Sequence, residues 1–185
     1  MKQGPHRITV EEYHRMAKVG LLKPDSRVEL IEGEIVEMAP IGMHHCSAVD
    51  RLNQWFGIAA GTQAIVRVGG SFRLSDITEP QPDVILLKPR EDFYWSRVAA
   101  GTDTLLVVEV SDSTLRYDRS VKVPLYGRHG IPEVWIVDLE TGQLHFFRKL
   151  IDGAYTEITT TDRPGVTALP GTQGLTVDLS KLLNN

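Results

Sequence analysis

The sequence predicts an α/β fold built around one mixed central sheet. Two short, almost wholly apolar segments, 82–88 (PDVILLK) and 104–110 (TLLVVEV), have the composition of strands that are covered on both faces of a sheet. Segments with helical spacing of apolar residues lie before and after them, at 45–60 and 115–129. Helices that alternate with strands along a chain are expected to pack on a shared sheet.

The N-terminal part, residues 9–40, is predicted to form a helix and a hairpin. The helix is expected from Thr9 to Lys18, because Thr9 can cap it and Glu12 follows at the spacing of a capping box. Segment 28–38 alternates apolar and acidic residues around Gly33. This alternation predicts two strands joined by a tight turn.

The predicted core covers residues 45–138. It begins with the helix at 45–60 and continues with a strand at 64–74 that is irregular at Gly69 and Gly70. Pro124 should bend or interrupt the helix at 115–129. A strand at 134–138 is expected to pair with 143–148, and the C-terminal residues 143–183 are predicted to form strands and turns.

Length and charge limit the classes of function. A chain of 185 residues suits a single domain, 1–185. The 20 basic and 24 acidic residues give a net charge of −4, which argues against coating nucleic acid by bulk charge. Cys46 is the one cysteine, so the sequence favours a reducing, cytoplasmic location. No apolar run reaches about 18 residues, and we expect no membrane span.

Two carboxylates stand in apolar strands. Asp83 lies at the head of one predicted strand and Glu109 near the end of another. A buried carboxylate is costly unless it is paired or binds a cation. On neighbouring strands these two acids could share one hard cation such as Mg²⁺, which accepts one or two carboxylates and keeps several waters.

A third group follows in the next predicted helix. Asp118, Lys122 and Tyr126 are four residues apart, so they line one face of that helix if it continues past Pro124. Lys122 would then lie beside the two acids and a phosphate. There it could orient an attacking water and stabilise charge in the transition state. The alternative is a surface ion pair between Asp118 and Lys122, worth about 0.3–0.5 kcal/mol.

These segments resemble a known family. The resemblance is carried by RVELIEGEIVEMAP, His45, EPQPDVILL and LLVVEVSDSTLRYDRSVKVPLYGRHGIPEVWIVD. They closely resemble the Uma-two putative restriction endonuclease family, formerly a domain of unknown function, within the PD-(D/E)xK nuclease superfamily. The resemblance runs from about Thr9 to about Leu182. It implies a restriction-endonuclease-like core of helix, three strands, helix and strand, preceded by the N-terminal helix and hairpin.

The resemblance also implies site residues. Asp83 and Glu109 match the two acids of the motif and would bind Mg²⁺ or Mn²⁺, with the backbone carbonyl of Val110 as a further ligand. The superfamily expects a lysine at the position of Ser111, and Lys122 is the residue that could replace it. An implied metal-dependent DNA endonuclease would use these groups, and a two-fold DNA site suits a homodimer.

Two further residues match family positions. Glu29 could approach the metal site or remain a solvated hairpin carboxylate, and the sequence does not decide between these. His45 could contact phosphate or support Glu29, although a histidine at a helix start is more often a cap or a packing residue. Zinc binding by His44, His45 and Cys46 is disfavoured, because consecutive residues rarely point at one metal.

Two questions stay open at this point. The absence of lysine at Ser111 and the acidic net charge allow a catalytically idle module that acts in nucleic-acid binding or protein interaction and could be linked to mobile elements. The aromatic cluster Phe93, Tyr94 and Trp95 could stack on bases. It could instead pack over the sheet or form part of a subunit contact.

Overall fold

The computed structural model describes residues 4–23 and 25–183 of the chain. A six-stranded mixed sheet runs through its centre in the order β3-β4-β5-β6-β7-β8. The strands are β3 (Ile65–Val68), β4 (Val84–Leu87), β5 (Thr104–Ser111), β6 (Val134–Asp138), β7 (Gln143–Ile151) and β8 (Ala154–Thr161). Only the β5–β6 pair is parallel, and the other neighbours are antiparallel. The predicted α/β class with a mixed central sheet is confirmed.

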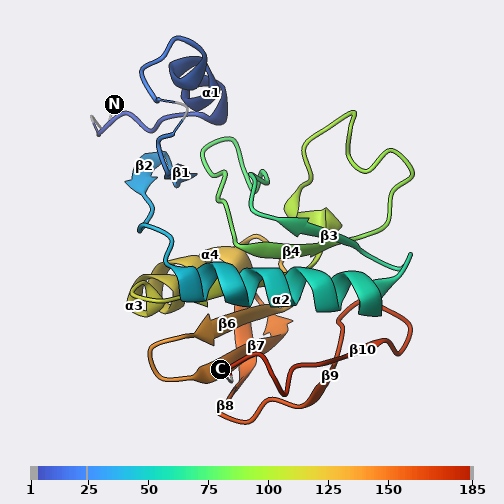
Figure 1. Cartoon of the computed structure of the whole chain (residues 1–185). Coiled ribbons are helices and arrows are strands. Elements are labelled where there is room, and N and C mark those ends of the chain that lie inside the picture. Colours follow the sequence, from blue (N-terminus) through green and yellow to red (C-terminus); the bar gives the residue numbers. More distant parts are fainter. Residues whose placement is uncertain (1–3, 24, 184–185) are drawn as a thin grey trace.

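One helix covers each face of the sheet. The long helix α2 (Met43–Ala60) crosses one face, and the apolar residues on that side form the larger core, around Phe56 and Trp135. The segment 115–128 covers the other face, where Tyr126 packs with Ile85 and Val107. Figure 1 shows α2 in front of the strands, with α3 (Leu115–Tyr117) and α4 (Val123–Arg128) behind it.

The N-terminal unit stands apart from the layers. Helix α1 (Val10–Lys18) begins after Thr9, whose side chain and that of Glu12 form the predicted capping box. The hairpin of β1 (Val28–Ile31) and β2 (Glu34–Glu37) turns at Glu32 and Gly33, both with positive φ. Figure 1 shows this unit projecting beyond β3, at the edge of the sheet.

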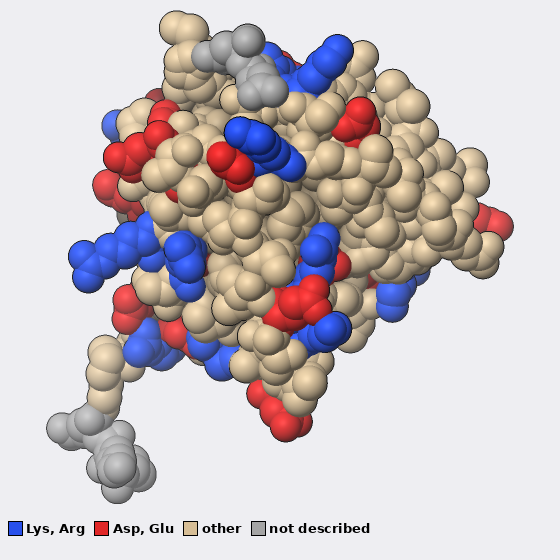
Figure 2. Space-filling view, turned by 90° about the horizontal axis from the view of Figure 1, so that it is seen from below, with Lys and Arg blue, Asp and Glu red and all other residues tan. Residues whose placement is uncertain are grey.

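The C-terminal tail returns along the α2 side. Strands β9 (Val166–Ala168) and β10 (Thr176–Asp178) form a small antiparallel pair, and Leu179 and Leu182 join the core under α2. In Figure 2, which looks at the molecule from below, basic and acidic side chains are interspersed among uncharged residues. This face therefore offers no continuous basic field for a polyanion.

Three element boundaries differ from the sequence prediction. Strand β3 ends at Val68 because Gly69 and Gly70 both take positive φ, so the strand expected to reach Leu74 stops early. Helix α2 begins at Met43, before His45. Strand β4 begins at Val84, so Asp83 immediately precedes the strand that was expected to include it.

The predicted helix at 115–129 is present in three pieces. Residues Asp118–Lys122 form a π-helical turn (η2) between α3 and α4, and the Val123 N–H bonds to the Asp118 carbonyl, five residues back. Pro124 has no N–H to continue the ordinary ladder, and a wider turn accommodates it. The expectation that Pro124 interrupts this helix is confirmed.

Candidate active site

The two acids lie opposite each other across neighbouring strands. In the antiparallel β4–β5 pair, Val84 is aligned with Val108, and extending this register by one residue aligns Asp83 with Glu109. Directly opposed residues project from the same face of a sheet. Val107 lies on the same face and packs with Tyr126 of the helical segment, so both carboxylates point toward the segment 115–128.

Asp83 is fixed by two hydrogen-bonding groups. Its Oδ2 accepts a bond from the Val110 N–H at 2.7 Å, and its Oδ1 lies 3.0 Å from His45 Nε2. His45 comes from the first turns of α2, so that helix holds one ligand candidate in place. The histidine thus contacts Asp83, whereas the sequence had suggested phosphate or Glu29 as its partner.

Glu109 is buried among groups of the facing segment. Its Oε1 accepts a hydrogen bond of 2.5 Å from the Tyr126 hydroxyl and lies 3.2 Å from Lys122 Nζ. Among the described residues, no hydrogen bond to the second oxygen, Oε2, is present. One oxygen of Glu109 is therefore committed to the protein, and the other remains free to accept a cation.

Lys122 reaches the carboxylates from the π-helical turn. Its ammonium is buried 3.2 Å from Glu109 Oε1 and 3.2 Å from Glu29 Oε2. A buried ammonium needs such partners because it has left its hydration shell. The structure thus brings Lys122 beside Glu109, one of the two acids expected from its spacing, and its second carboxylate partner is Glu29 instead of Asp83.

Glu29 belongs to the site and is not a solvated hairpin carboxylate. It is buried, and besides Lys122 it accepts a hydrogen bond from the Gln81 N–H at 3.2 Å. The hairpin is tied to the segment before Asp83, because Leu30 and Glu79 exchange backbone hydrogen bonds. The N-terminal unit therefore contributes an acid to a centre built mainly by the core.

Ser111 and Asp118 form a supporting pair beneath this centre. The Ser111 hydroxyl donates to Asp118 Oδ2 at 2.7 Å, and the Thr114 hydroxyl donates to the same oxygen at 2.6 Å. These bonds join the end of β5 to the start of η2. Ser111 thus stands where a superfamily lysine is expected, but its hydroxyl anchors the turn that carries Lys122.

A cleft of about 720 Å³ opens over the site. Glu29, His45, Asp83, Glu109 and Lys122 all line it. Its rim includes several residues that sequence reasoning did not single out: Met38, Ile41, Asp112, Arg116 and Tyr117. Arg116 and Tyr117 lie in the stretch that joins β5 to Lys122, which was the only sequence signal that could have identified them.

Burial shapes the protonation of the site. Burial raises the pKa of the Glu109 carboxyl to about 8, against the opposing charge of Lys122. Burial alone would lower the pKa of the Lys122 amine, but Glu109, Glu29 and Asp118 outweigh it and raise that pKa above its usual value. The Lys122 ammonium is therefore charged at neutral pH. Burial also raises the pKa of Tyr126, so its hydroxyl keeps its proton and stays a donor.

The described residues contain no group of three His, Cys, Asp or Glu side chains arranged to hold a metal ion. A cation in the cleft would have Asp83 and Glu109 as its side-chain ligands, with oxygen donors only. This donor set fits Mg²⁺ or Mn²⁺, which are held by one or two carboxylates and keep several waters. Zn²⁺ favours nitrogen and sulfur ligands, which the pair does not offer.

The model of the Uma2 family, described as putative restriction endonuclease, matches residues 10–180. The chain belongs to the Uma2 family. The family description points to a nuclease-like protein, and restriction-endonuclease-like proteins generally use divalent metals. No curated protein matches the chain.

A solved structure supports the fold. The chain is similar to a putative nuclease of the DUF820 family from Anabaena variabilis ATCC 29413, with a TM-score of 0.71 and 15% sequence identity. The match covers 95% of this chain and 97% of the other. At this identity the likeness shows the fold alone. Within the described residues of this Uma2 protein, no helix is both long and apolar enough to cross a membrane.

Proposed function

We propose that this Uma2 protein is a Mg²⁺- or Mn²⁺-dependent endonuclease that hydrolyses phosphodiester bonds of DNA. The observation that carries the proposal is the meeting of Asp83, Glu109 and Lys122 in one cleft, although they come from three separate segments. Two acids in register can hold a cation, and an amine beside one of them can stabilise developing negative charge, so the arrangement suits metal-assisted hydrolysis of a phosphodiester.

Asp83 and Glu109 would hold the cation, with the Val110 carbonyl as a further ligand. When bound, the cation would supply positive charge to the phosphate and lower the pKa of water. His45 and the Val110 N–H fix the Asp83 carboxylate in its orientation. The Tyr126 hydroxyl does the same for Glu109 through Oε1, so Oε2 would be the oxygen offered to the cation.

Lys122 would act on the water and on the phosphate. Its charge is kept by the surrounding acids, so it serves as a hydrogen-bond donor and not as a base. A fixed ammonium can orient the attacking water and stabilise the negative charge that develops on the phosphate oxygens. Glu29 is the second carboxylate partner of the amine, and the two contacts together fix its position.

The direct test is cleavage of supercoiled plasmid DNA with Mg²⁺ or Mn²⁺, with EDTA as the blank. We expect nicked or linear product from the wild type and a loss of at least about 100-fold from Asp83→Asn and from Lys122→Met. Arg163→Gln, which changes an exposed cation far along the chain, should leave cleavage unchanged. Equal activity in all variants would rule out this site, and no activity in the wild type would favour the catalytically idle module.

The proposal includes a homodimer and a cytoplasmic location. A pair of two-fold related sites would cut both strands of a symmetric DNA sequence. The single Cys46 needs no oxidising compartment. Sedimentation velocity of the protein with and without a DNA duplex would show whether one or two copies are present.

A further inference from the structure

The loop between β4 and β5 exposes large aromatic side chains that the proposed chemistry does not use. Trp95 is 94% exposed and Phe93 is 71% exposed, while Tyr94 between them is buried. Figure 1 shows this loop projecting beyond β3 on the same edge of the sheet as the N-terminal unit. Two exposed aromatic rings on one loop indicate a surface that a binding partner covers.

The loop holds these rings in place by a strained but well-supported backbone. Phe93 and Tyr94 have φ of 49° and 64°, a region that bulky residues rarely adopt. Asp92 supports the turn by accepting bonds from the Tyr94 N–H at 3.1 Å and from the Ser96 hydroxyl at 2.6 Å. The Tyr94 hydroxyl donates to the Lys88 carbonyl at 2.9 Å. Strain maintained in this way is typical of ligand-contacting segments.

Arginines surround the buried ring at the base of the loop. The guanidinium groups of Arg67, Arg90 and Arg97 lie 5.6, 5.7 and 5.2 Å from the centre of the Tyr94 ring. Arg90 pairs with Asp92, and Arg97 pairs with Asp103. Within the described part of the chain, Arg67 has no carboxylate at ion-pair distance. Arg67 and Trp95 line the same surface hollow, so a cation is available beside this exposed ring.

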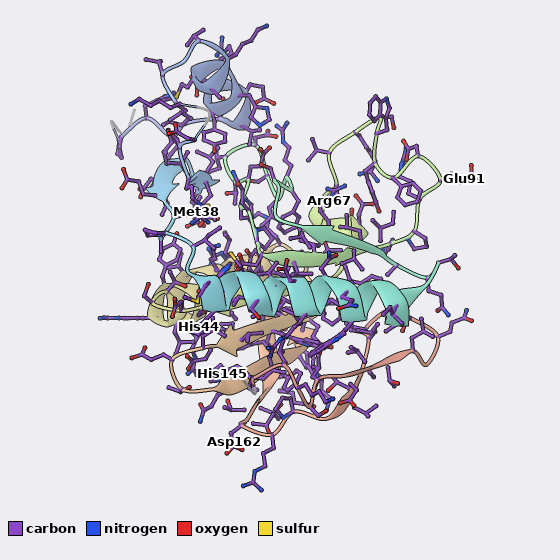
Figure 3. All side chains as sticks on the ribbon, in the orientation of Figure 1. Met38, His44, Arg67, Glu91, His145 and Asp162 are labelled. Carbon is purple, nitrogen blue, oxygen red and sulfur yellow. The ribbon has the colours of Figure 1, made fainter. Side chains whose placement is uncertain are left out.

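Arg67 links this loop to the candidate active site. It is aligned with Ile85 in the β3–β4 pair, and Asp83 lies two residues earlier along the same line. Arg67 and Asp83 are thus diagonal neighbours on one face of the sheet, about 7–8 Å apart. In Figure 3 Arg67 lies between the N-terminal unit, near Met38, and the loop that carries Glu91. Arg67 thus connects Asp83 at the cleft with the hollow that Arg67, Trp95 and Arg97 line at the base of the loop.

We propose that this aromatic–arginine surface binds unpaired nucleotides that flank the cleaved phosphate. The proposal rests on the proposed nuclease function and deepens it, because it names a substrate with a single-stranded segment. Exposed rings stack readily on unpaired bases, whose faces are open, and arginine binds the phosphates between them. The run from Asp83 to Lys88 spans about 17 Å at about 3.3 Å per residue. At about 3.4 Å per stacked nucleotide, the contact falls about five nucleotides from the metal site.

A second copy of the chain fits this surface less well. A two-fold contact would place Arg67 and Arg97 of one copy near the same residues of the other, since such an interface uses one patch twice. Like charges brought together in this way oppose association. A nucleic-acid strand instead supplies flat bases that can stack on the exposed rings and phosphates that complement the arginines.

The test is a fluorescence titration in EDTA, which separates binding from cleavage. The probes are a 20-nucleotide oligodeoxythymidylate, a 4-nucleotide one and a blunt 20-base-pair duplex. We expect the long single strand to quench tryptophan emission in the wild type. Trp95→Ala should remove that quenching and weaken binding of the long strand about tenfold. Binding of the blunt duplex and of the short strand should be unchanged by Trp95→Ala.

Two further variants complete the design. Arg67→Gln should weaken binding of the long strand severalfold. It should also lower the salt dependence of that binding by about one released ion. Ile58→Ala, which truncates an exposed apolar residue on α2, should have no effect. Identical binding by wild type and Trp95→Ala would overturn the inference, as would a protein dimer that Trp95→Ala dissociates. Strand binding through Trp95 without any cleavage would support the inference while the nuclease proposal fails.

Discussion

Replacing Lys122 by methionine should destabilise the protein in a pH-dependent way. Methionine keeps an unbranched stem of similar length and removes the charge. The ammonium lies 3.2 Å from a carboxylate oxygen of Glu29 and 3.2 Å from one of Glu109, and all three groups are buried. Removing one partner of a buried ionic group leaves uncompensated charge and costs about 3–5 kcal/mol of unfolding free energy.

The sign of the pH dependence follows from Glu109. Its folded pKa is raised to about 8 from 4.5, so its contribution to stability is fully present below pH 4.5 and is lost as the pH rises to about 8. The Lys122 charge limits this rise in pKa. Without it the pKa rises further, and each added unit extends the loss by about 1.4 kcal/mol. The variant should therefore differ from wild type more at pH 9 than at pH 6.

Urea unfolding of both proteins at pH 6 and pH 9 measures this difference. Lys149→Met is the matched control, because Lys149 forms an exposed pair with Glu157 at 2.5 Å. Such a pair contributes about 0–1 kcal/mol, so the control should lose little at either pH. If Lys122→Met loses no more than Lys149→Met, or loses equally at both values of pH, the buried carboxylate–lysine arrangement is wrong.

Three further outcomes are expected. The affinity for Mg²⁺, measured by calorimetry, should rise about tenfold per pH unit up to about pH 8, since the cation must displace the proton of Glu109; a flat profile would exclude that carboxylate as a ligand. Gly127→Ala should cost about 1–3 kcal/mol in thermal unfolding, because a Cβ there meets the Gly153 carbonyl oxygen at 2.4 Å, whereas Gly57→Ala on α2 meets nothing and should stabilise slightly. Thr9→Ala should cost about 1 kcal/mol by removing the cap of α1, and an unchanged melting temperature would contradict the capping box.

The central sheet was predictable because its strands have an unusual composition. Strands β4 and β5 are buried along their whole lengths, and their apolar runs show this without tertiary information. The capping box at Thr9 and the hairpin turn at Gly33 are likewise local patterns of a few residues. Features that depend on residues close to one another in the sequence can therefore be predicted from the sequence alone.

The site was only partly predictable because it depends on contacts between distant segments. The cost of burying a carboxylate pointed to Asp83 and Glu109, but nothing local showed that Glu29 would leave solvent to meet Lys122. The contact of His45 with Asp83 depends on the packing of α2 against the sheet, which no periodicity reports. The π-helical turn depends on how the chain adapts to Pro124. The low helix propensity of proline predicts that the helix is interrupted, but not the form that the interruption takes.

The position of the metal ion tests the central claim most directly. A crystal grown with Mn²⁺ can be measured for anomalous scattering. We expect one strong peak between the carboxylates of Asp83 and Glu109 in the wild type and in Arg163→Gln, and no peak there in Asp83→Asn. A peak at another place in a protein that cleaves DNA, or a peak that persists in Asp83→Asn, would show that these carboxylates do not hold the ion.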